Sequence, residues 1–194
     1  MNYLAHFYLA DPEPDLMFGN FIGDGVRGSD LQRFPDPVAR GVRFHRFIDT
    51  YTDGHPEVLD AKKLFYPSQS KFSGVAVDVL FDHLLALKWT EHHDEALDAF
   101  ATRCYALIGS KSELLPKRSE RFYHYMAGND ILSHYATRDG IERVFRGMDG
   151  RTAYSSNMIQ AMEAADGFWD EFNAYFDRFF PNLVDACNEW KTIH

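Results

Sequence analysis

The stretch VAVDVLFDHLLAL, residues 75–87, decides the fold class because a helix of this sequence is apolar around nearly its whole circumference. Such a helix is buried and needs other helices packed around it. Asp78 and Asp82 are four residues apart and share one stripe with Val75 and Leu85. Two buried carboxylates repel each other and are costly unless something cationic neutralises them. Arginine partners in two buried ion pairs would suffice, but a divalent metal ion is the more economical explanation, because it would also use Asp24, His45 and Asp49.

The rest of the chain also has helical patterning, and sustained alternation of the strand type is missing. Asp36-Pro37 is a good helix start, with the acid as N-cap and proline at the first helical position, and this helix runs to about Tyr51. Further helices are expected at residues 73–89, 94–108, 116–127, 130–147 and 152–190, the last broken near Asp166-Gly167 and Pro181. We therefore predict one domain over residues 1–194, an all-α bundle of about seven or eight helices.

The composition is ordinary for a soluble globular protein, with 45% hydrophobic and 25% charged residues in 194. No apolar run approaches the ~20 residues of a membrane span, and the first residues carry no basic leader, so we expect a cytoplasmic protein without a membrane partner. The formal net charge of −9 argues against nucleic acid as a partner. The two cysteines, Cys104 and Cys187, form no Cys-x-x-Cys motif and are expected to be buried thiols.

The charges are unevenly distributed. Between residues 160 and 190, seven acids stand against the single Arg178, whereas residues 27–46 hold five arginines against two acids. The five are Arg27, Arg33, Arg40, Arg43 and Arg46. This segment can present a basic strip to an acidic partner, and a solvated charged face would have the same composition.

Residues 19–28, GNFIGDGVRG, contain a literal G-x-G-x-x-G pattern. That pattern indicates a dinucleotide site only between a strand and a helix of a parallel sheet, so we reject the dinucleotide interpretation here. What remains is Asp24 in a glycine-rich segment, where backbone can approach a ligand closely. A plain turn would also explain the glycines.

His45 and Asp49 are four residues apart within residues 42–53, VRFHRFIDTYTD, and project from one face of the expected helix. Val38 and Val42 continue that face and point it inward. Imidazole and carboxylate at this spacing suit a divalent metal ion. A buried hydrogen bond between the two side chains would use the same geometry.

Four motifs follow one another in the first half of the chain: MNYLAH at residues 1–6, GN followed by D-x-VRG within residues 19–28, HR-x-ID-x-x-TD at residues 45–53, and DV-x-x-DH at residues 78–83. In residue types, order and spacing, these motifs resemble the acyl carrier protein phosphodiesterase family. The resemblance implies hydrolysis of the phosphodiester between 4′-phosphopantetheine and the serine of holo-acyl carrier protein, with Mn²⁺ or Mg²⁺. It also implies a distant relation to HD-type metal phosphohydrolases, although Asp82-His83 reverses the order of their His-Asp pair.

The resemblance and the residue patterns together give a set of expected site residues. One or two divalent ions are expected among Asp24, His45, Asp49, Asp78 and Asp82. Arg27 and Arg46 are expected to offset charge on the phosphoryl oxygens, with Asp24 and His83 as the other catalytic residues. The predicted substrate-binding residues are His6, Asn20, Arg40 and Arg43, the last two steering an acidic carrier protein.

Two rival functions stay open at this stage. One is an HD-like phosphohydrolase that acts on a nucleotide, which would share the metal site. The other is a non-catalytic helical module that binds carrier protein, for which inward-facing carboxylates have no evident use.

Overall fold

The computed structural model describes residues 1–149 and 156–194, and these residues form twelve α-helices and five 3-10 helices with no strand. The first six helices are α1 (Tyr3–Ala10), α2 (Pro14–Ile22), α3 (Asp36–Gly54), α4 (Pro56–Gln69), α5 (Ser73–Leu87) and α6 (Trp89–His92). The others are α7 (Leu97–Gly109), α8 (Lys117–Gly128), α9 (Ile131–His134), α10 (Arg138–Asp149), α11 (Ala161–Asp166) and α12 (Trp169–Ile193). The 3-10 helices are η1 (Gly23–Gly25), η2 (Gly28–Arg33), η3 (Ser70–Phe72), η4 (Ser112–Leu114) and η5 (Met158–Gln160). The predicted all-α class is confirmed.

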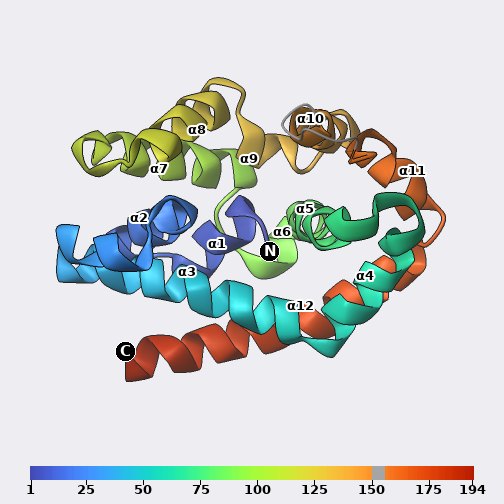
Figure 1. The fold of residues 1–194 in the computed structure, drawn as a ribbon, viewed down its shortest axis with the longest axis horizontal. Helices are drawn as coiled ribbons and strands as arrows, with labels where there is room; N and C mark the ends of the chain where they lie inside the picture. Colours follow the sequence, from blue (N-terminus) through green and yellow to red (C-terminus); the bar gives the residue numbers. More distant parts are fainter. Residues whose placement is uncertain (150–155) are drawn as a thin grey trace.

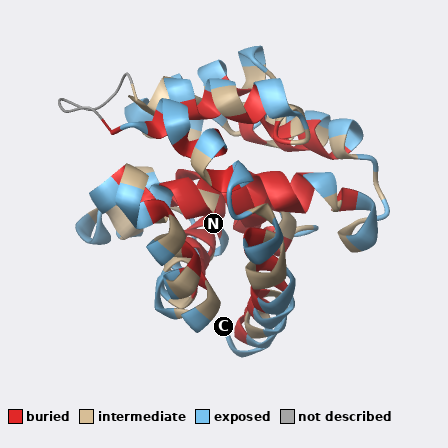
Figure 2. Ribbon diagram, turned by 90° about the vertical axis from the view of Figure 1, so that its right-hand side faces the viewer, coloured by how far each residue is buried: buried red, intermediate tan, exposed pale blue. Residues whose placement is uncertain are grey.

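The helices form two groups with the N-terminus between them. In Figure 1, α7, α8, α9 and α10 lie along one side of the molecule, while α1, α2, α3 and α5 lie beneath them. The long helix α12 runs along the outer side of α3 and α4 and packs on both. Figure 2 shows buried residues on the faces that the two groups turn toward each other. One continuous core includes residues from Met1 to Trp190.

Helix α5 is the buried helix that the sequence predicts. Its residues from Val79 to Ala86 are all buried, and its most exposed residues are Val75 and Leu87 near its two ends. It packs against α1, α4, α10 and α12. Phe81 of α5 contacts two aromatic rings of α12, with ring centroids 5.6 Å and 5.7 Å apart. These contacts tie the C-terminal helix to the N-terminal half of the chain.

Several element boundaries differ from the sequence prediction. Helices α1, α2 and α4 lie in segments where no helix was expected, so the predicted count of seven or eight is too low. The expected break near Gly167 is present between α11 and α12, but α12 continues through Pro181 without interruption. Residues 152–155 of the expected helix 152–190 lie outside the described residues.

Two further expectations concern the cysteines and the membrane. Cys104 and Cys187 are both buried free thiols, as expected. Within the described ranges, no helix combines the length and the apolar character that crossing a bilayer would require.

Asp82 has a structural role that the sequence did not reveal. Its side chain is completely buried, and its two oxygens accept backbone N–H groups from Asn2 at 3.0 Å, Leu4 at 2.7 Å and Ala5 at 3.4 Å. These are orphan donors of the first turn of α1, which a carboxylate satisfies well. Burial raises the pKa of Asp82 to about 7, against the N-terminal amine and the backbone donors that lower it. The expected metal-ligand role of Asp82 is therefore corrected to that of a helix cap supplied by another helix.

Asp78, the other predicted metal ligand on α5, binds the amino group of Met1. Its Oδ1 accepts the amino group of Met1 at 2.8 Å, and its side chain is partly exposed. The expected cationic partner is present for Asp78, in the form of the amino group of Met1, whereas Asp82 is bound by uncharged backbone N–H groups. Asp78 borders the cleft described below without joining the metal-ligand group.

Replacing Asp82 with alanine leaves three backbone donors of α1 without an acceptor. Because buried unpaired donors cost about 1–3 kcal/mol each, we expect the free energy of unfolding to fall by roughly 3–5 kcal/mol. Urea denaturation of both proteins measures this change. Asp53→Ala is the control, since its exposed ion pair with Lys62 should contribute about 1 kcal/mol or less. Equal losses for the two variants would contradict the assigned role of Asp82.

Candidate active site

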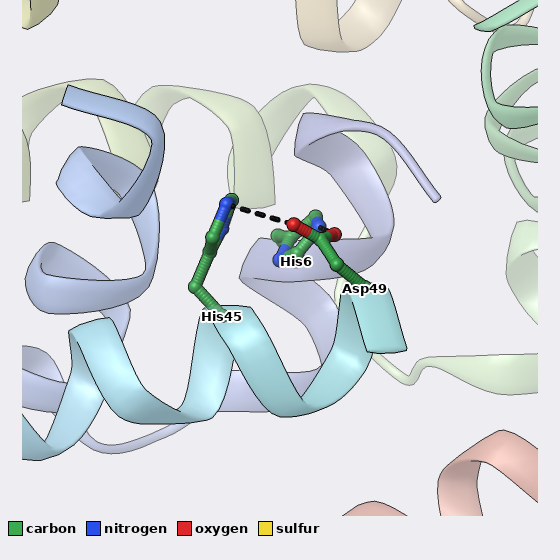
Figure 3. A group of neighbouring side chains, drawn as sticks. All are labelled: His6, His45 and Asp49. Carbon is green, nitrogen blue, oxygen red and sulfur yellow. Dashed lines mark ion pairs between the residues drawn. The ribbon is translucent and has the colours of Figure 1, made fainter. Parts of the chain in front are cut away.

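The candidate site joins a residue of α1 to two residues of α3. His6, His45 and Asp49 offer ligand atoms that all lie within 4.8 Å of one another. Asp49 Oδ1 is 3.2 Å from His6 Nε2, and Asp49 Oδ2 is 3.1 Å from His45 Nε2. Figure 3 shows the carboxylate of Asp49 next to the imidazole of His6 and joined to His45 by an ion pair. The spacing of four residues between His45 and Asp49 places both on the inner face of α3, as predicted.

The orientation of His6 is fixed by Asn20 of α2. Asn20 Nδ2 donates to the carbonyl oxygen of His6 at 2.7 Å, so Asn20 Oδ1 faces the ring of the same histidine. His6 Nδ1 lies 2.7 Å from this oxygen and must carry a proton to bond with it. His6 Nε2 then presents a lone pair toward Asp49 when the ring is neutral. A metal-binding histidine is held in the same way, by donating from its other nitrogen.

The ring of His45 is positioned by packing. Its Nδ1 is buried without a hydrogen-bond partner, so no polar contact orients that edge. The ring stacks on His6, with centroids 4.4 Å apart. On its other side lies Gly23, where an added Cβ would be 2.3 Å from His45 Cγ. The glycine-rich segment is therefore a 3-10 helix whose first glycine makes room for the histidine.

Asp24 stands next to this group in η1. Its Oδ1 is 3.3 Å from His45 Nε2, and its Oδ2 accepts from the hydroxyl of Tyr3 at 3.4 Å. The side chain of Asp24 is 61% exposed, compared with 42% for Asp49 and 7% for His45. Asp24 is thus the carboxylate of this site that is most open to a substrate.

The charges of these groups depend on one another. Burial lowers the pKa of His45, but its hydrogen bonds with Asp24 and Asp49 outweigh burial and bring that pKa to about 9. Burial raises the pKa of Asp49, whereas hydrogen bonds with His45 and His6 hold it well below its ordinary value. The bond with His45 also lowers the pKa of Asp24. Burial and the neighbouring His45 lower the pKa of His6. Without a metal, the site holds two carboxylates and one protonated imidazole at neutral pH.

The site opens into a cleft of about 940 Å³ between the two helix groups. The near wall is formed by α1, η1, α3 and the start of α5, and the far wall by α8, α9 and α10. Polar residues of the near wall include Asn2, Tyr3, His6, Asp24, His45, Asp49, Thr52, Asp53 and Asp78. The far wall contributes Arg118, Ser119, Arg121, Phe122, Tyr125, Ile131, Tyr135, Val144, Gly147 and Met148.

Two other predicted residues, His83 and Asn20, do not reach this cleft, whereas His6 lines it. His83 is buried, and its Nδ1 bonds to the carbonyl oxygen of Tyr135, so the expected role as catalytic acid or base is not supported. Asn20 is only 1% exposed and cannot contact a substrate, so its predicted binding role is corrected to that of holding His6. His6, expected to bind substrate, belongs to the potential metal-ligand group.

The arginines of the expected basic strip are spread over the surface. Arg46 donates to the carbonyl oxygen of Val26, and Arg40 binds Glu13 and the carbonyl oxygen of Lys191. Neither lines the cleft, so the structure assigns both of them contacts within the protein instead of the substrate contacts that we expected. Arg27 and Arg43 are exposed and also lie outside the cleft lining. Their substrate contacts remain predictions.

Helix α8 contributes cleft residues that were not predicted from the sequence. Arg118, Arg121, Phe122 and Tyr125 follow helical spacing and line the cleft together. The spacing was visible in the sequence, but nothing local indicated which face of this helix would meet the N-terminal motifs.

An all-helical protein with two histidines and two aspartates at an open cleft has the donor groups of a hydrolase site. The family comparison specifies this further: the chain belongs to the acyl carrier protein phosphodiesterase family, whose model matches residues 1–183.

Curated relatives support this assignment over nearly the whole chain. An acyl carrier protein phosphodiesterase of Enterobacter sp. (strain 638) is 31% identical over 191 residues, covering 97% of this chain and 99% of the relative. The protein of the same name from Salmonella agona (strain SL483) is 30% identical over 188 residues, covering 95% and 96%. No solved structure matches the chain, and the distant HD-type relation stays a prediction.

The raised pKa of His45 gives a pH dependence of stability in chelator-treated protein. Its ion pairs contribute fully below the unfolded pKa of about 6.5 and are lost as the pH rises through about 9. We expect a loss of roughly 1–2 kcal/mol between these limits, since Asp24 and Asp49 are partly exposed. Urea denaturation at pH 6, 7.5 and 9.5 measures it. His45→Gln should remove this part of the dependence; an unchanged profile in the variant would contradict the assignment.

Proposed function

We propose that this protein hydrolyses the phosphodiester between 4′-phosphopantetheine and the serine of holo-acyl carrier protein. Family membership supports the reaction and substrate, because the curated relatives carry the name acyl carrier protein phosphodiesterase. The observation that carries the proposal is the group of His6, His45 and Asp49 beside a long open cleft. A cleft of about 940 Å³ leaves room for an extended arm that enters from a partner protein.

We further propose that His6, His45 and Asp49 hold a divalent metal ion. The donor set fits a metal ion. The protonated Nδ1 of His6 donates to Asn20, so Nε2 carries the lone pair, and this nitrogen lies 3.2 Å from Asp49 Oδ1. Two electron-rich atoms at that distance need a proton or a cation between them, and burial lowers the pKa of His6. Two imidazoles and a carboxylate favour Mn²⁺ over Mg²⁺, which prefers oxygen ligands. When bound, the ion would lower the pKa of a water and polarise a phosphoryl oxygen.

The residues of the chain supply position and proton transfer. Asp24 is ionised and exposed to the cleft, so it can orient the attacking water and accept its proton. Tyr3 holds Asp24 through its hydroxyl. Attack on phosphorus breaks the bond to the serine oxygen, which takes up a proton, and yields 4′-phosphopantetheine and the unmodified serine.

The two rival functions are tested by the same assay. A nucleotide phosphohydrolase would turn over nucleotides faster than holo-carrier protein. A non-catalytic module would bind carrier protein in the presence of chelator and release nothing.

Mass spectrometry of holo-carrier protein tests the reaction directly. We expect loss of the 4′-phosphopantetheine mass with Mn²⁺ and no loss after chelation. The physical reason is that the two carboxylates alone would repel the anionic diester. Unchanged mass under every condition would remove the proposed function, and equal loss with and without chelator would remove its metal dependence.

Asp49→Asn should lower kcat/KM for holo-carrier protein by at least about 100-fold, because the ion loses an anionic ligand. Asp53→Asn is the matched control on the same helix. Asp53 also borders the cleft, but its carboxylate pairs with Lys62 at 2.7 Å and lies outside the metal-ligand group. We expect less than a threefold change for this control. Steady-state kinetics of both variants measure these changes. An equal loss of kcat/KM in Asp49→Asn and Asp53→Asn would contradict the assignment of Asp49 as a metal ligand.

Asn20→Ala should weaken Mn²⁺ binding by about 10- to 100-fold, because the tautomer of His6 is no longer fixed. Titration calorimetry with Mn²⁺ measures the affinity, and circular dichroism checks that the variant folds. A folded variant with unchanged affinity would show that Asn20 does not position His6.

A further inference from the structure

One face of α8 forms a cationic wall opposite the carboxylates of the site. Arg118, Arg121, Phe122 and Tyr125 are spaced at three and four residues, so they lie on one side of the helix, and all four line the cleft. The two arginines occupy the N-terminal half of this face. They are also the only Arg or Lys residues of the cleft lining among the residues that the structure describes.

This wall lies close to the proposed reaction centre. A Cβ added to Gly25 would be 2.4 Å from Ser119 Oγ, so α8 touches the residue that follows Asp24. The ring of Phe122 lies 4.5 Å from that of Tyr3, whose hydroxyl binds Asp24. Helix α8 therefore contacts Gly25, which follows Asp24 in the chain, and Tyr3, which binds Asp24. Arg118 and Arg121 precede the two contacting residues, Ser119 and Phe122, in the helix.

Among the residues that the structure describes, neither Arg118 nor Arg121 has an ion-pair or hydrogen-bond partner, and both are exposed. By contrast, Arg46 is held by the backbone of Val26, and Arg40 by Glu13. Free guanidinium groups that line a cleft are available to an anionic ligand.

The near wall creates a need for such groups. Asp24, Asp49, Asp53 and Asp78 all line it, although Asp53 and Asp78 are paired with Lys62 and with the amino group of Met1. Asp24 is 61% exposed, and the whole chain has a formal net charge of −9. A phosphodiester anion that approaches Asp24 is repelled by its carboxylate unless positive charge faces the anion from the other side.

We propose that Arg118 and Arg121 bind the phosphodiester anion of the substrate and face it from the wall opposite Asp24 and Asp49. This inference rests on the proposed phosphodiesterase function and adds two binding residues from the C-terminal half of the chain. It also transfers to α8 the phosphate-binding role that the sequence suggested for Arg27 and Arg46.

The test uses Arg118→Gln, Arg121→Gln and the double variant as Mn²⁺-loaded full-length proteins. Each arginine that bonds the anion should contribute about tenfold to kcat/KM, and the pair about 100-fold. The loss should be similar for holo-carrier protein and for bis(4-nitrophenyl) phosphate, because both present a phosphodiester. Lys117→Gln is the matched control, since Lys117 precedes Arg118, is exposed and lies outside the cleft lining, and it should stay within twofold of wild type.

Three results would overturn the proposal. One is unchanged kinetics in the double variant, and another is an equal loss in Lys117→Gln. The third is a loss confined to holo-carrier protein, because the arginines would then contact the carrier protein instead of the diester. Thermal melts confirm that the variants fold.

Titration calorimetry with 4′-phosphopantetheine separates this proposal from the proposed function. If wild-type protein hydrolyses neither substrate, the function fails. The arginine assignment is still decided, because the double variant should bind 4′-phosphopantetheine at least about tenfold more weakly than wild type. Equal affinities would contradict it.

Discussion

The placement of helix α1 depends on one buried carboxylate. Asp82 of α5 has no access to water, and the backbone donors of Asn2, Leu4 and Ala5 satisfy it. This contact fixes the first turn of α1 against the most deeply buried helix of the protein. His6 follows one turn later, and its ring therefore meets the inner face of α3, where His45 and Asp49 project. The candidate site thus exists because a core helix caps the helix that carries its first histidine.

Sequence reasoning succeeded where the information was local. The buried helix at residues 75–87 and the pairing of His45 with Asp49 follow from helical periodicity alone. It failed for Asp82, because the hydrogen-bonding capacity of this carboxylate is satisfied by backbone donors of α1, a helix that the sequence pattern did not indicate. The first ten residues are apolar on every side and offer no amphipathic signal, so α1 was missed. The roles of Arg118 and Asn20 depend on which helices meet in space, and no local pattern contains that information.

The two walls of the cleft contribute different groups to the proposed reaction. The N-terminal wall collects imidazoles and carboxylates, which suit a metal ion and an activated water. The C-terminal wall supplies the arginines that an anionic substrate needs in a protein of net negative charge. The family model spans both walls, since it covers residues 1–183. In the proposed reaction the substrate lies between these two parts of the chain.

The central claim is that His6, His45 and Asp49 converge on one divalent ion. Anomalous diffraction from crystals grown with Mn²⁺ tests it most directly. We predict a single strong peak about 2 Å from His6 Nε2, His45 Nε2 and an oxygen of Asp49, with Asn20 still bonded to His6 Nδ1. A peak elsewhere, or no peak while Asp49 stays hydrogen-bonded to both histidines, would contradict the account.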